Sequence, residues 1–454
     1  MTADSMTDDD ARKHKRYTFE RHATDYREKF LETTQEMHEK CPVAWSDTYD
    51  GHWVAASSDA VFELARCPYV SNDHDVRNER TGYKGISIPT AERAAGVRGG
   101  ILEMDEPEHK FFRSILNPYL SPAAVKRWVP VIDMVIHACI DEKIESGRID
   151  FVDELANVVP AVLTLAMLGI PVEKWEIYNE PVHAAVYTPP DSPDAPRVAE
   201  LHRQLGIDLI TNLFEIRANP RPGIINAVAN ASIDGGAPDD MELLGILSLV
   251  IGGGFDTTTA LTAHALEWLA ENPAERQRLS DDRDTLLDGA TEEFLRYFTP
   301  AAGDGRTISK DFESEEGTDF REGDRLWLSW AMANRDAELF DDPNAIHLDR
   351  TGNRHFSFGL GIHRCIGSNV ARTVFKRMLI AVLDRMPDYQ CDPAGTVHYD
   401  SIGVIQGMRH LPATFTPGPR THATLADTLV EVQKMVDEQV LAEPLALAKT
   451  KQKA

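Results

Sequence analysis

The chain of 454 residues carries 73 acidic against 47 basic side chains, which gives a formal net charge of −26 at pH 7. This balance argues against general nucleic-acid binding, because phosphates need Lys and Arg as partners. The 42% share of hydrophobic residues is enough for a large folded core and argues against disorder throughout the chain.

The five cysteines, Cys41, Cys67, Cys139, Cys365 and Cys391, are scattered, and none belongs to a C-x-x-C pair. A disulfide framework or a zinc knuckle is therefore not expected. A reducing compartment such as the cytoplasm fits this use of cysteine.

Residues 1–18 form a polar N-terminal segment that we expect to be flexible. The segment has no apolar run and predicts neither a signal peptide nor a membrane anchor. The longest mainly apolar stretch, Leu243 to Phe255, is too short to span a bilayer and contains four glycines. We interpret it as a helix buried inside the protein.

The spacing of apolar residues predicts a helix-rich chain with a few short strands. In chain order, we expect a strand at Trp53–Ala55, a helix at Ala60–Leu64, mainly helix from Pro122 to about Glu275 with a loop at 189–194, a helix near Thr285–Phe298, a strand at Asp324–Ser329 and a helix at Val370–Arg385. The predicted fold class is mainly α with small β-sheets. Because no repeat and no linker is evident before Pro419, we expect one domain over residues 19–419.

The tail, residues 420–454, has a pattern of its own. Leu425, Leu429, Val432 and Val436 recur at helical spacing and predict an amphipathic helix. Such a helix either packs on its own domain or is a frayed terminus, or else it serves docking or oligomerisation. The sequence leaves both alternatives open.

Residues 356–369, FSFGLGIHRCIGSN, surround Cys365 with glycines and precede a long helical pattern. Glycine permits tight turns and close approach of the backbone. A thiol at the N-terminus of a helix meets free N–H groups and the positive end of the helix dipole, and both lower its pKa. Taken alone, one cysteine among glycines is usually structural.

Two upstream patterns also carry chemistry. His109 and Arg113 lie four residues apart, so they share one helix face and suit a carboxylate, although an isolated pair of this kind is usually an ordinary surface pair. Asp256 and Thr257 follow glycines within the buried helix, where an acid and a hydroxyl suit proton delivery. The alternative for this second pattern is helix packing around small residues, with Asp256 on a solvated edge.

The segment from Phe358 to Gly367 matches F-G-x-G-x-H-x-C-x-G and resembles the haem-binding loop of the cytochrome P-450 family. The resemblance implies the cytochrome P-450 fold, with haem b between an oxygen-activating helix and the cysteine loop. It also implies that the Cys365 thiolate is the axial metal ligand and that Phe358 shields it. The implied cofactor-binding residues are Cys365, His109, Arg113, Arg306, His363, Phe358, Gly359, Gly367 and Gly253.

The upstream patterns occur in the order that the family predicts. By resemblance, His109 and Arg113 form the H-x-x-x-R pair that binds haem propionates, which Arg306 and His363 also approach. The usual D-P-P before this pair is Asp-Glu-Pro here, a departure outside the binding residues. Arg306 follows Pro300-Ala-Ala-Gly instead of the common Pro-Val, and these small side chains would leave more room above the haem.

Residues 253–257 resemble the family motif [AG]-G-x-[DE]-T. The resemblance implies that Thr257 holds bound dioxygen and its water network, and that Asp256 relays the protons needed to cleave the O–O bond. Glu293 and Arg296 match the E-x-x-R motif, a structural pair whose expected partner is Arg350.

The family activity implied for this chain is that of a monooxygenase, which inserts one atom of dioxygen into a substrate. No flavin or nicotinamide fingerprint occurs, so electrons from NAD(P)H are expected through a separate reductase and a ferredoxin or flavodoxin. Such carriers are often acidic, and a basic docking patch is predicted from Lys110, Arg113, Arg364, Arg372 and Lys376, although a solvated helix face is the alternative.

The substrate is predicted to be a lipophilic small molecule, such as a terpenoid, steroid, fatty acid or aromatic compound. By family position, the contact residues are expected to be Ile88, Leu249, Val250, Gly253, Ala301, Ala302 and Val404, which are mostly apolar or small. Two alternatives remain: a peroxygenase that uses hydrogen peroxide directly, and a non-enzymatic haem sensor or electron carrier. The first usually lacks the acid–threonine pair, and the second needs an output module, for which the tail is the only candidate.

Overall fold

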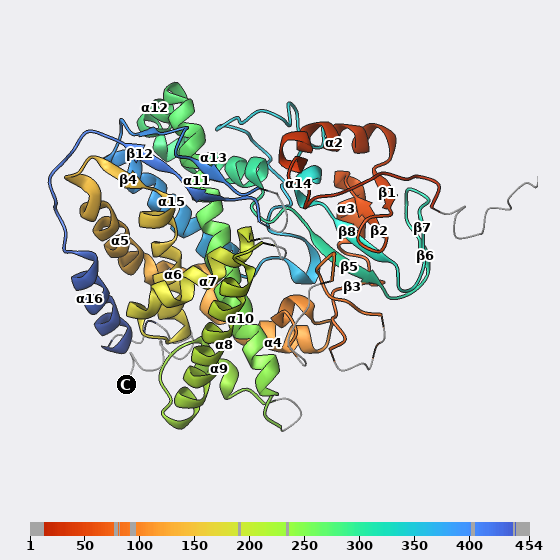
Figure 1. Cartoon of the computed structure of the whole chain (residues 1–454), viewed down its shortest axis with the longest axis horizontal. Coiled ribbons are helices and arrows are strands. Elements are labelled where there is room, and N and C mark those ends of the chain that lie inside the picture. The colour runs from red at the N-terminus through yellow and green to blue at the C-terminus, as the bar shows by residue number, and fades with distance from the viewer. Residues whose placement is uncertain are drawn as a thin grey trace, which may run out of the picture.

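The structure of the protein, a computed structural model, describes residues 13–76, 80, 82–90, 97–188, 192–232, 236–400, 405–438 and 441. Its helices gather on one side of the molecule, and its largest sheet lies on the other side with two short N-terminal helices (Figure 1). The helices are α2 Tyr26–Lys40, α3 Ser58–Leu64, α4 Glu108–Leu120, α5 Pro122–Ile144, α6 Val158–Leu168, α7 Trp175–Tyr187, α8 Ala195–Ala218, α9 Ile224–Ala229, α10 Asp240–Gly254, α11 Asp256–Glu271, α12 Pro273–Asp281, α13 Arg283–Phe298, α14 Trp330–Ala333, α15 Ser368–Arg385 and α16 Leu425–Glu438, with single turns η1 Gly100–Glu103, η2 Val152–Ala156, η3 Val172–Lys174 and η4 Gly361–His363.

The five-stranded sheet has the order β1-β2-β8-β5-β3, in which only β2 and β8 pair in parallel. Three smaller sheets join β4-β12-β9, β10-β11 and β6-β7. The strands are β1 Val43–Ser46, β2 His52–Ala55, β3 Val70–Ser71, β4 Arg148–Asp150, β5 Asp304–Ile308, β6 Phe312–Glu313, β7 Asp319–Phe320, β8 Arg325–Leu328, β9 Gln390–Cys391, β10 Val397–His398, β11 Met408–His410 and β12 Pro412–Thr414. The predicted class, mainly α with small sheets, is confirmed.

The buried apolar helix lies in the centre of the helical side. It is interrupted once, at Phe255, where the backbone (φ −92°, ψ −81°) separates α10 from α11. Together the two helices span 32 residues and are apolar enough to cross a membrane by length and composition, yet 56% of the most apolar window is buried inside the protein. That burial is what the central helix of a folded core shows.

Both ends of the described chain lie against the fold. Of the N-terminal segment that we predict to be flexible, residues 13–18 are described, and they run alongside β1, where Tyr17 donates its backbone N–H to the Trp45 carbonyl at 3.0 Å. At the other end α16 packs along α5 (Figure 1), with Val432 and Val436 buried. The tail helix therefore packs on the molecule's own surface, as the first of the two alternatives proposed.

A buried ionic network ties α13 to the segment before the cysteine loop. The Arg296 guanidinium donates to both carboxylate oxygens of Glu293 at 2.8 Å, and Arg350 Nε lies 2.9 Å from the same carboxylate. Neither Glu293 nor Arg296 exposes any side-chain surface. Burial alone raises the pKa of Glu293, but hydrogen bonds from Arg296, the His347 N–H and Arg350 outweigh it and lower the pKa.

Replacing Glu293 by Gln leaves two guanidinium groups, those of Arg296 and Arg350, without their buried countercharge. We expect the free energy of unfolding at pH 7 to fall by about 3–5 kcal/mol, as measured by urea denaturation of the haem-loaded protein. Because the pKa of Glu293 is lowered in the folded state, this stabilisation is present above the ordinary pKa of Glu and fades as the pH falls below it.

The matched control is Glu200→Gln, which removes an exposed pair with Arg203 and should cost less than about 1 kcal/mol. Equal losses in the two variants would contradict the structural role of the Glu293 network.

Candidate active site

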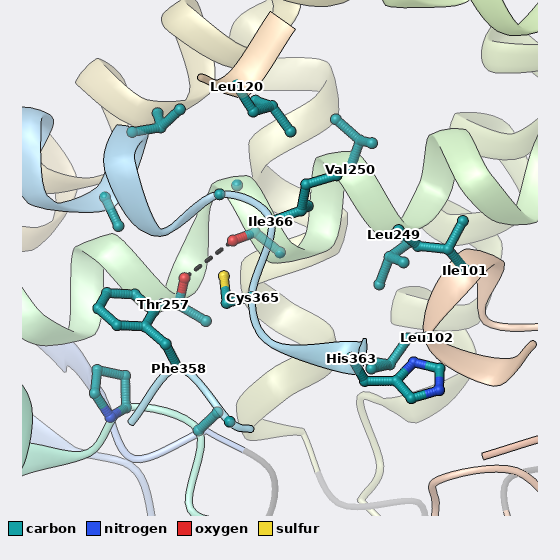
Figure 2. Close-up of a pocket in the computed structure, with 18 of the residues that line it drawn as sticks. Ile101, Leu102, Leu120, Leu249, Val250, Thr257, Phe358, His363, Cys365 and Ile366 are labelled. Atoms are coloured by element: carbon teal, nitrogen blue, oxygen red, sulfur yellow. Dashed lines mark hydrogen bonds between the residues drawn. The ribbon is translucent and has the colours of Figure 1, made fainter. Parts of the chain in front are cut away.

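A cavity of about 270 Å³ lies between α10 and α11 on one side and the cysteine loop on the other (Figure 2). Its wall is largely apolar, with Ile101, Leu102, Leu249, Val250 and Ile366 among the lining residues. Cys365 points its sulfur into this space, and Thr257 lines the same cavity (Figure 2). The predicted ligand and the predicted oxygen-binding hydroxyl are therefore brought together on opposite walls.

The cysteine loop has a shape that depends on glycine. Gly359 and Gly361 adopt φ values of +63° and +67°, a region that L side chains rarely adopt. At Gly361 a Cβ atom would lie 2.8 Å from the Ala65 carbonyl oxygen, so the loop could not approach α3 with any larger residue. The Cys365 N–H closes the turn by donating to the Phe358 carbonyl at 2.7 Å. The loop thus fixes the direction of the thiol.

The electrostatics of the thiol differ from the sequence prediction. Burial raises the pKa of Cys365, and this outweighs the opposing effects of the Gly367 N–H and of the charges on Arg364, Arg113 and Arg372. The lowering predicted from the helix N-terminus is present in the hydrogen bond of the Gly367 N–H, but burial outweighs it. A cation bound directly to sulfur would supply the missing countercharge, because metal binding deprotonates a thiol.

Four cationic or potentially cationic side chains, His109, Arg113, Arg306 and His363, line the same cavity. The rings of His109 and His363 lie 4.3 Å apart, and both ring nitrogens of His109 and Nδ1 of His363 are buried without a hydrogen-bond partner. Burial lowers the pKa of His363 to about 2, assisted by the charges of Arg306, His109 and Arg113. Such a set of unused donors suits an anion, and a pair of carboxylates in particular.

These residues fit the haem that the family resemblance implies. The thiol offers one soft ligand for iron. The unpartnered imidazole nitrogens, together with the guanidinium groups of Arg113 and Arg306, which each also donate to a backbone carbonyl, offer donors for two propionates. Phe358 lies beside the sulfur (Figure 2), and Gly359 and Gly367 also line the cavity. All the predicted cofactor-binding residues therefore lie on one cavity.

Asp256 and Thr257, the acid–alcohol pair, lie on two different sides of α11. Thr257 lines the cavity and donates its hydroxyl to the Gly253 carbonyl at 3.0 Å, and a Cβ at Gly253 would meet nothing within 4 Å. Asp256 does not line the cavity: it is 2% exposed and accepts a hydrogen bond from Tyr399 at 3.1 Å. Its other partner is His183, whose Nδ1 lies 2.6 Å away. The alternative that placed Asp256 on a solvated edge is wrong.

Sequence reasoning did not identify His183 and Tyr399. Each lies more than seventy residues from Asp256 along the chain, with separations of 73 and 143 residues. No motif or spacing joins residues so far apart, and only the fold places them together.

The predicted substrate contacts are brought together only in part. Leu249, Val250, Gly253 and Ala301 line the cavity. Ile88 and Ala302 do not, because they pack in a separate core cluster that contains Phe19, Met37 and Trp327. The predicted extra room from small residues after Pro300 therefore comes from Ala301, whereas Gly303 packs on Trp327. Val404 lies outside the described residues.

Two further groups within the described residues have spacing that could hold a metal ion: His264, Glu267 and His398, and Asp150, Asp153 and His410. In the first group His398 Nε2 already contacts the Glu267 carboxylate at 2.8 Å. The remaining ring nitrogens, His264 Nε2 and His398 Nδ1, are buried without partners, whereas metal-binding imidazoles usually donate that second N–H. This group is better described as a hydrogen-bonded cluster.

Comparison with known proteins agrees with this geometry. The sequence model of the cytochrome P450 family matches residues 215–387. Vitamin D3 dihydroxylase from Streptomyces griseolus is 28% identical over 373 residues, which cover 81% of this chain and 89% of the relative. Cytochrome P450 109 from Bacillus spizizenii is 31% identical over 279 residues, which cover 60% of this chain and 68% of the relative.

A solved structure has the same fold. CYP109E1 from Bacillus megaterium in complex with testosterone superposes with a TM-score of 0.74 at 26% identity, covering 87% of this chain and 99% of its own. The chain belongs to the cytochrome P450 family of haem-dependent monooxygenases.

Proposed function

We propose that the protein hydroxylates an uncharged lipophilic molecule of steroid or terpenoid size, and that residues 19–419 form its catalytic domain. The observation that carries this proposal is the separation of charge around the cavity. Its charged or potentially charged lining residues within the described chain are His109, Arg113, Asp304, Arg306 and His363, apart from the ligand Cys365. Four of them, His109, Arg113, Arg306 and His363, suit the haem propionates, and Asp304 lies 3.9 Å from Arg306. The apolar lining residues are therefore left for the substrate.

This separation favours a neutral substrate over a fatty acid. A carboxylate in an apolar pocket needs a buried cation or several donors, because an unpaired buried charge is costly. The lining residues Leu249, Val250, Ile101 and Met167 offer neither. Two of the similar proteins act on or bind such neutral polycyclic lipids, vitamin D3 in one case and testosterone in the other.

A spectral titration tests the substrate class. We expect progesterone, a neutral steroid probe, to shift the haem iron from low to high spin with a dissociation constant at least about tenfold below that of palmitate, a difference of about 1.4 kcal/mol in binding free energy. Val250→Phe, which fills the apolar side of the cavity, should weaken the steroid response by a similar factor.

The control is Val430→Phe on α16, where the side chain is 72% exposed and the titration should not change. Tighter binding of palmitate than of any neutral probe would contradict the proposed substrate class.

Haem, when bound, supplies the iron at which dioxygen is activated. The chain's own part is to hold the propionates through His109, Arg113, Arg306 and His363, and to deliver protons at the cavity wall. We infer that the Thr257 hydroxyl positions water next to dioxygen and that the Asp256 carboxyl passes protons towards it. The presence of both residues favours a monooxygenase driven by electrons over a peroxygenase driven by hydrogen peroxide.

Substitution of Asp256 and of Thr257 tests their proposed role in proton delivery. We expect Asp256→Asn to lower the electron-driven turnover rate about 100-fold and Thr257→Ala to divert most electrons from product to peroxide, because each removes a group used in proton delivery. The measurements are product formed and NADPH consumed with a surrogate ferredoxin and reductase. Unchanged turnover and coupling in both variants would refute the proton-delivery assignment, while the spectrum of the carbon-monoxide complex reports intact haem ligation.

Electrons are proposed to come from NAD(P)H through a separate reductase and a ferredoxin or flavodoxin that docks near the thiolate. Three of the five cations predicted for the basic docking patch are not available to a partner. Arg372 forms a paired contact with Glu292 at 2.6 Å, and Lys376 lies 2.8 Å from Asp288, so α13 neutralises both cations. Arg113 faces the cavity. The exposed cations left for docking are Lys110 and Arg364.

The charge-reversal variants Lys110→Glu and Arg364→Glu should slow reduction of the haem iron by an acidic ferredoxin several-fold at low salt, with less effect as ionic strength rises. Stopped-flow measurement of the first reduction step reports this directly. Arg203→Glu, an exposed change on α8, is the control. If the salt dependence of reduction were the same in all three variants and the wild type, the docking site would lie elsewhere.

A haem sensor is the less supported function. The tail was the only candidate output module in the sequence, and the helix α16 lies against α5 and η3. Gln433 on α16 also accepts the backbone N–H of Val172 at 3.0 Å. A helix held in this way extends the core instead of forming a separate module.

A further inference from the structure

The Asp256 carboxylate is held on the side of α11 that faces away from the active-site cavity. The side chain is 2% exposed, and its hydrogen-bond partners His183 and Tyr399 are not among the residues that line the cavity. Tyr399 donates its hydroxyl to the two carboxylate oxygens at 3.1 Å each, and His183 Nδ1 lies 2.6 Å from one of them. A group in this place cannot reach the cavity without turning.

Thr257, the next residue, projects from the helix about 100° further round its axis, which is the angle per residue of an α-helix. It faces the cavity. A proton that passes from Asp256 to the water held by Thr257 must therefore cross from one side of the helix to the other. Rotation of the Asp256 side chain achieves this only after its bonds to His183 and Tyr399 have weakened.

The His183 side chain lies on α7 and is nearly buried, with 11% of its surface exposed. The titratable groups in contact with it are Asp256 from α11, Tyr399, and Tyr187 from its own helix with ring centroids 5.3 Å apart. Asp153 from η2 makes no direct contact with His183, but the charge of the imidazole acts on its carboxylate.

The Asp153 carboxylate belongs to a cluster that reaches solvent. His410 Nδ1 lies 3.0 Å from Asp153 and 3.3 Å from Asp150, and the side chains of Asp153 and His410 are 47% and 52% exposed. Such a group of carboxylates and an imidazole can exchange protons with water and hold them close to His183. The chain therefore places one group of titratable side chains at the surface and a second group, His183 and Asp256, in the interior, and the two groups interact through their charges.

We propose that His183 is a positioning residue that transfers a proton to Asp256, and that the cluster of Asp150, Asp153 and His410 returns a proton to His183. The inference rests on the proposed role of Asp256 and Thr257 in proton delivery. In the first step the N–H bond of the imidazolium breaks and an O–H bond forms on Asp256, so a charged pair becomes a neutral pair. The neutral carboxyl is held less strongly, turns towards Thr257 and releases its proton there.

The balance of charge supports these steps. Although the Asp153 side chain is half-exposed, its partial burial raises its pKa, and the charge of Asp150 raises it further. Both effects favour a proton held at the entrance. Burial and the Asp256 carboxylate raise the pKa of Tyr399, so its phenol stays protonated and remains a fixed hydrogen-bond donor. Tyr399 can therefore hold Asp256 but not supply the proton, and this leaves His183 as the proton donor in contact with Asp256.

The central test is His183→Asn in the haem-loaded protein, because the Asn amide can keep the hydrogen bond of Nδ1 to Asp256 but cannot titrate. We expect turnover with the surrogate redox partners to fall at least about tenfold and the ratio of rates in H₂O and D₂O to rise. Substrate binding and the carbon-monoxide spectrum should be unchanged. His202→Asn, on exposed surface of α8, is the matched control and should match the wild type in every measurement.

A second variant acts at the surface, where folding is not at risk. Asp153→Asn removes negative charge near His183, which makes the imidazolium less favourable. The alkaline limb of the turnover–pH profile should therefore move to lower pH by roughly half a unit. A merely structural role of His183 predicts neither this movement nor the change in solvent isotope effect.

The outcomes distinguish failure of the relay through His183 from failure of the proposed role of Asp256 and Thr257. If Asp256→Asn impairs turnover but His183→Asn and Asp153→Asn leave rate, isotope effect and pH profile unchanged, the relay through His183 is refuted and the proposed function stands. If Asp256→Asn also leaves turnover unchanged, the proton-delivery role of the acid–alcohol pair falls with it.

Discussion

The thiol of Cys365 is the constraint on which the rest of the active site depends. Burial disfavours its charged form more than the nearby Gly367 N–H and arginine charges favour it. Because metal binding deprotonates a thiol, an iron ion bound to this sulfur would supply the countercharge. The surrounding loop fixes the geometry of the thiol. Gly359 and Gly361 adopt backbone conformations that L residues rarely adopt, and the hydrogen bond from the Cys365 N–H to the Phe358 carbonyl sets the direction of the sulfur.

The ionic network of α13 holds this loop from behind. Arg296, besides its bonds to Glu293, donates to the Asn334 carbonyl at 2.9 Å. The Asn334 side chain in turn accepts the Phe356 N–H at 2.7 Å and donates to Ser357 Oγ at 2.9 Å. A chain of buried hydrogen bonds therefore joins the E-x-x-R motif to the first residues of the cysteine loop. This connection explains why a buried ion pair is retained although an apolar pair of the same volume would be as stable.

Residues that act through local spacing could be predicted from the sequence, whereas residues that meet through the fold could not. The cysteine loop, the His109–Arg113 pair and the position of Thr257 each follow from a short pattern, and the structure places all of them on one cavity. The same reasoning failed for Ile88 and Ala302, because facing a cavity or a core depends on which sheet packs behind a residue.

Pairing between distant helices also escapes a single sequence. The predicted docking cations Arg372 and Lys376 are neutralised by Glu292 and Asp288 from α13, which lie 80 and 88 residues away. The number of basic residues on one helix therefore gives only an upper limit for the positive charge available to a binding partner.

The interruption between α10 and α11 lies where neighbouring side chains face two different surroundings, the cavity and the buried contacts with His183 and Tyr399. A Cβ atom at Gly254 would lie 2.7 Å from Thr164 Oγ1, so glycine is needed for close packing on α6, while Gly253 leaves open space towards the cavity. Two adjacent glycines are costly within a helix, by about 1 kcal/mol each relative to alanine. The cost is consistent with a local break at Phe255 that directs Thr257 to the cavity and Asp256 to His183 and Tyr399. Because the two side chains face different surroundings, hydration at the cavity can change without exposing the buried carboxylate. In the proposed relay, a proton on the Asp256 carboxylate is what frees this side chain to turn towards the cavity.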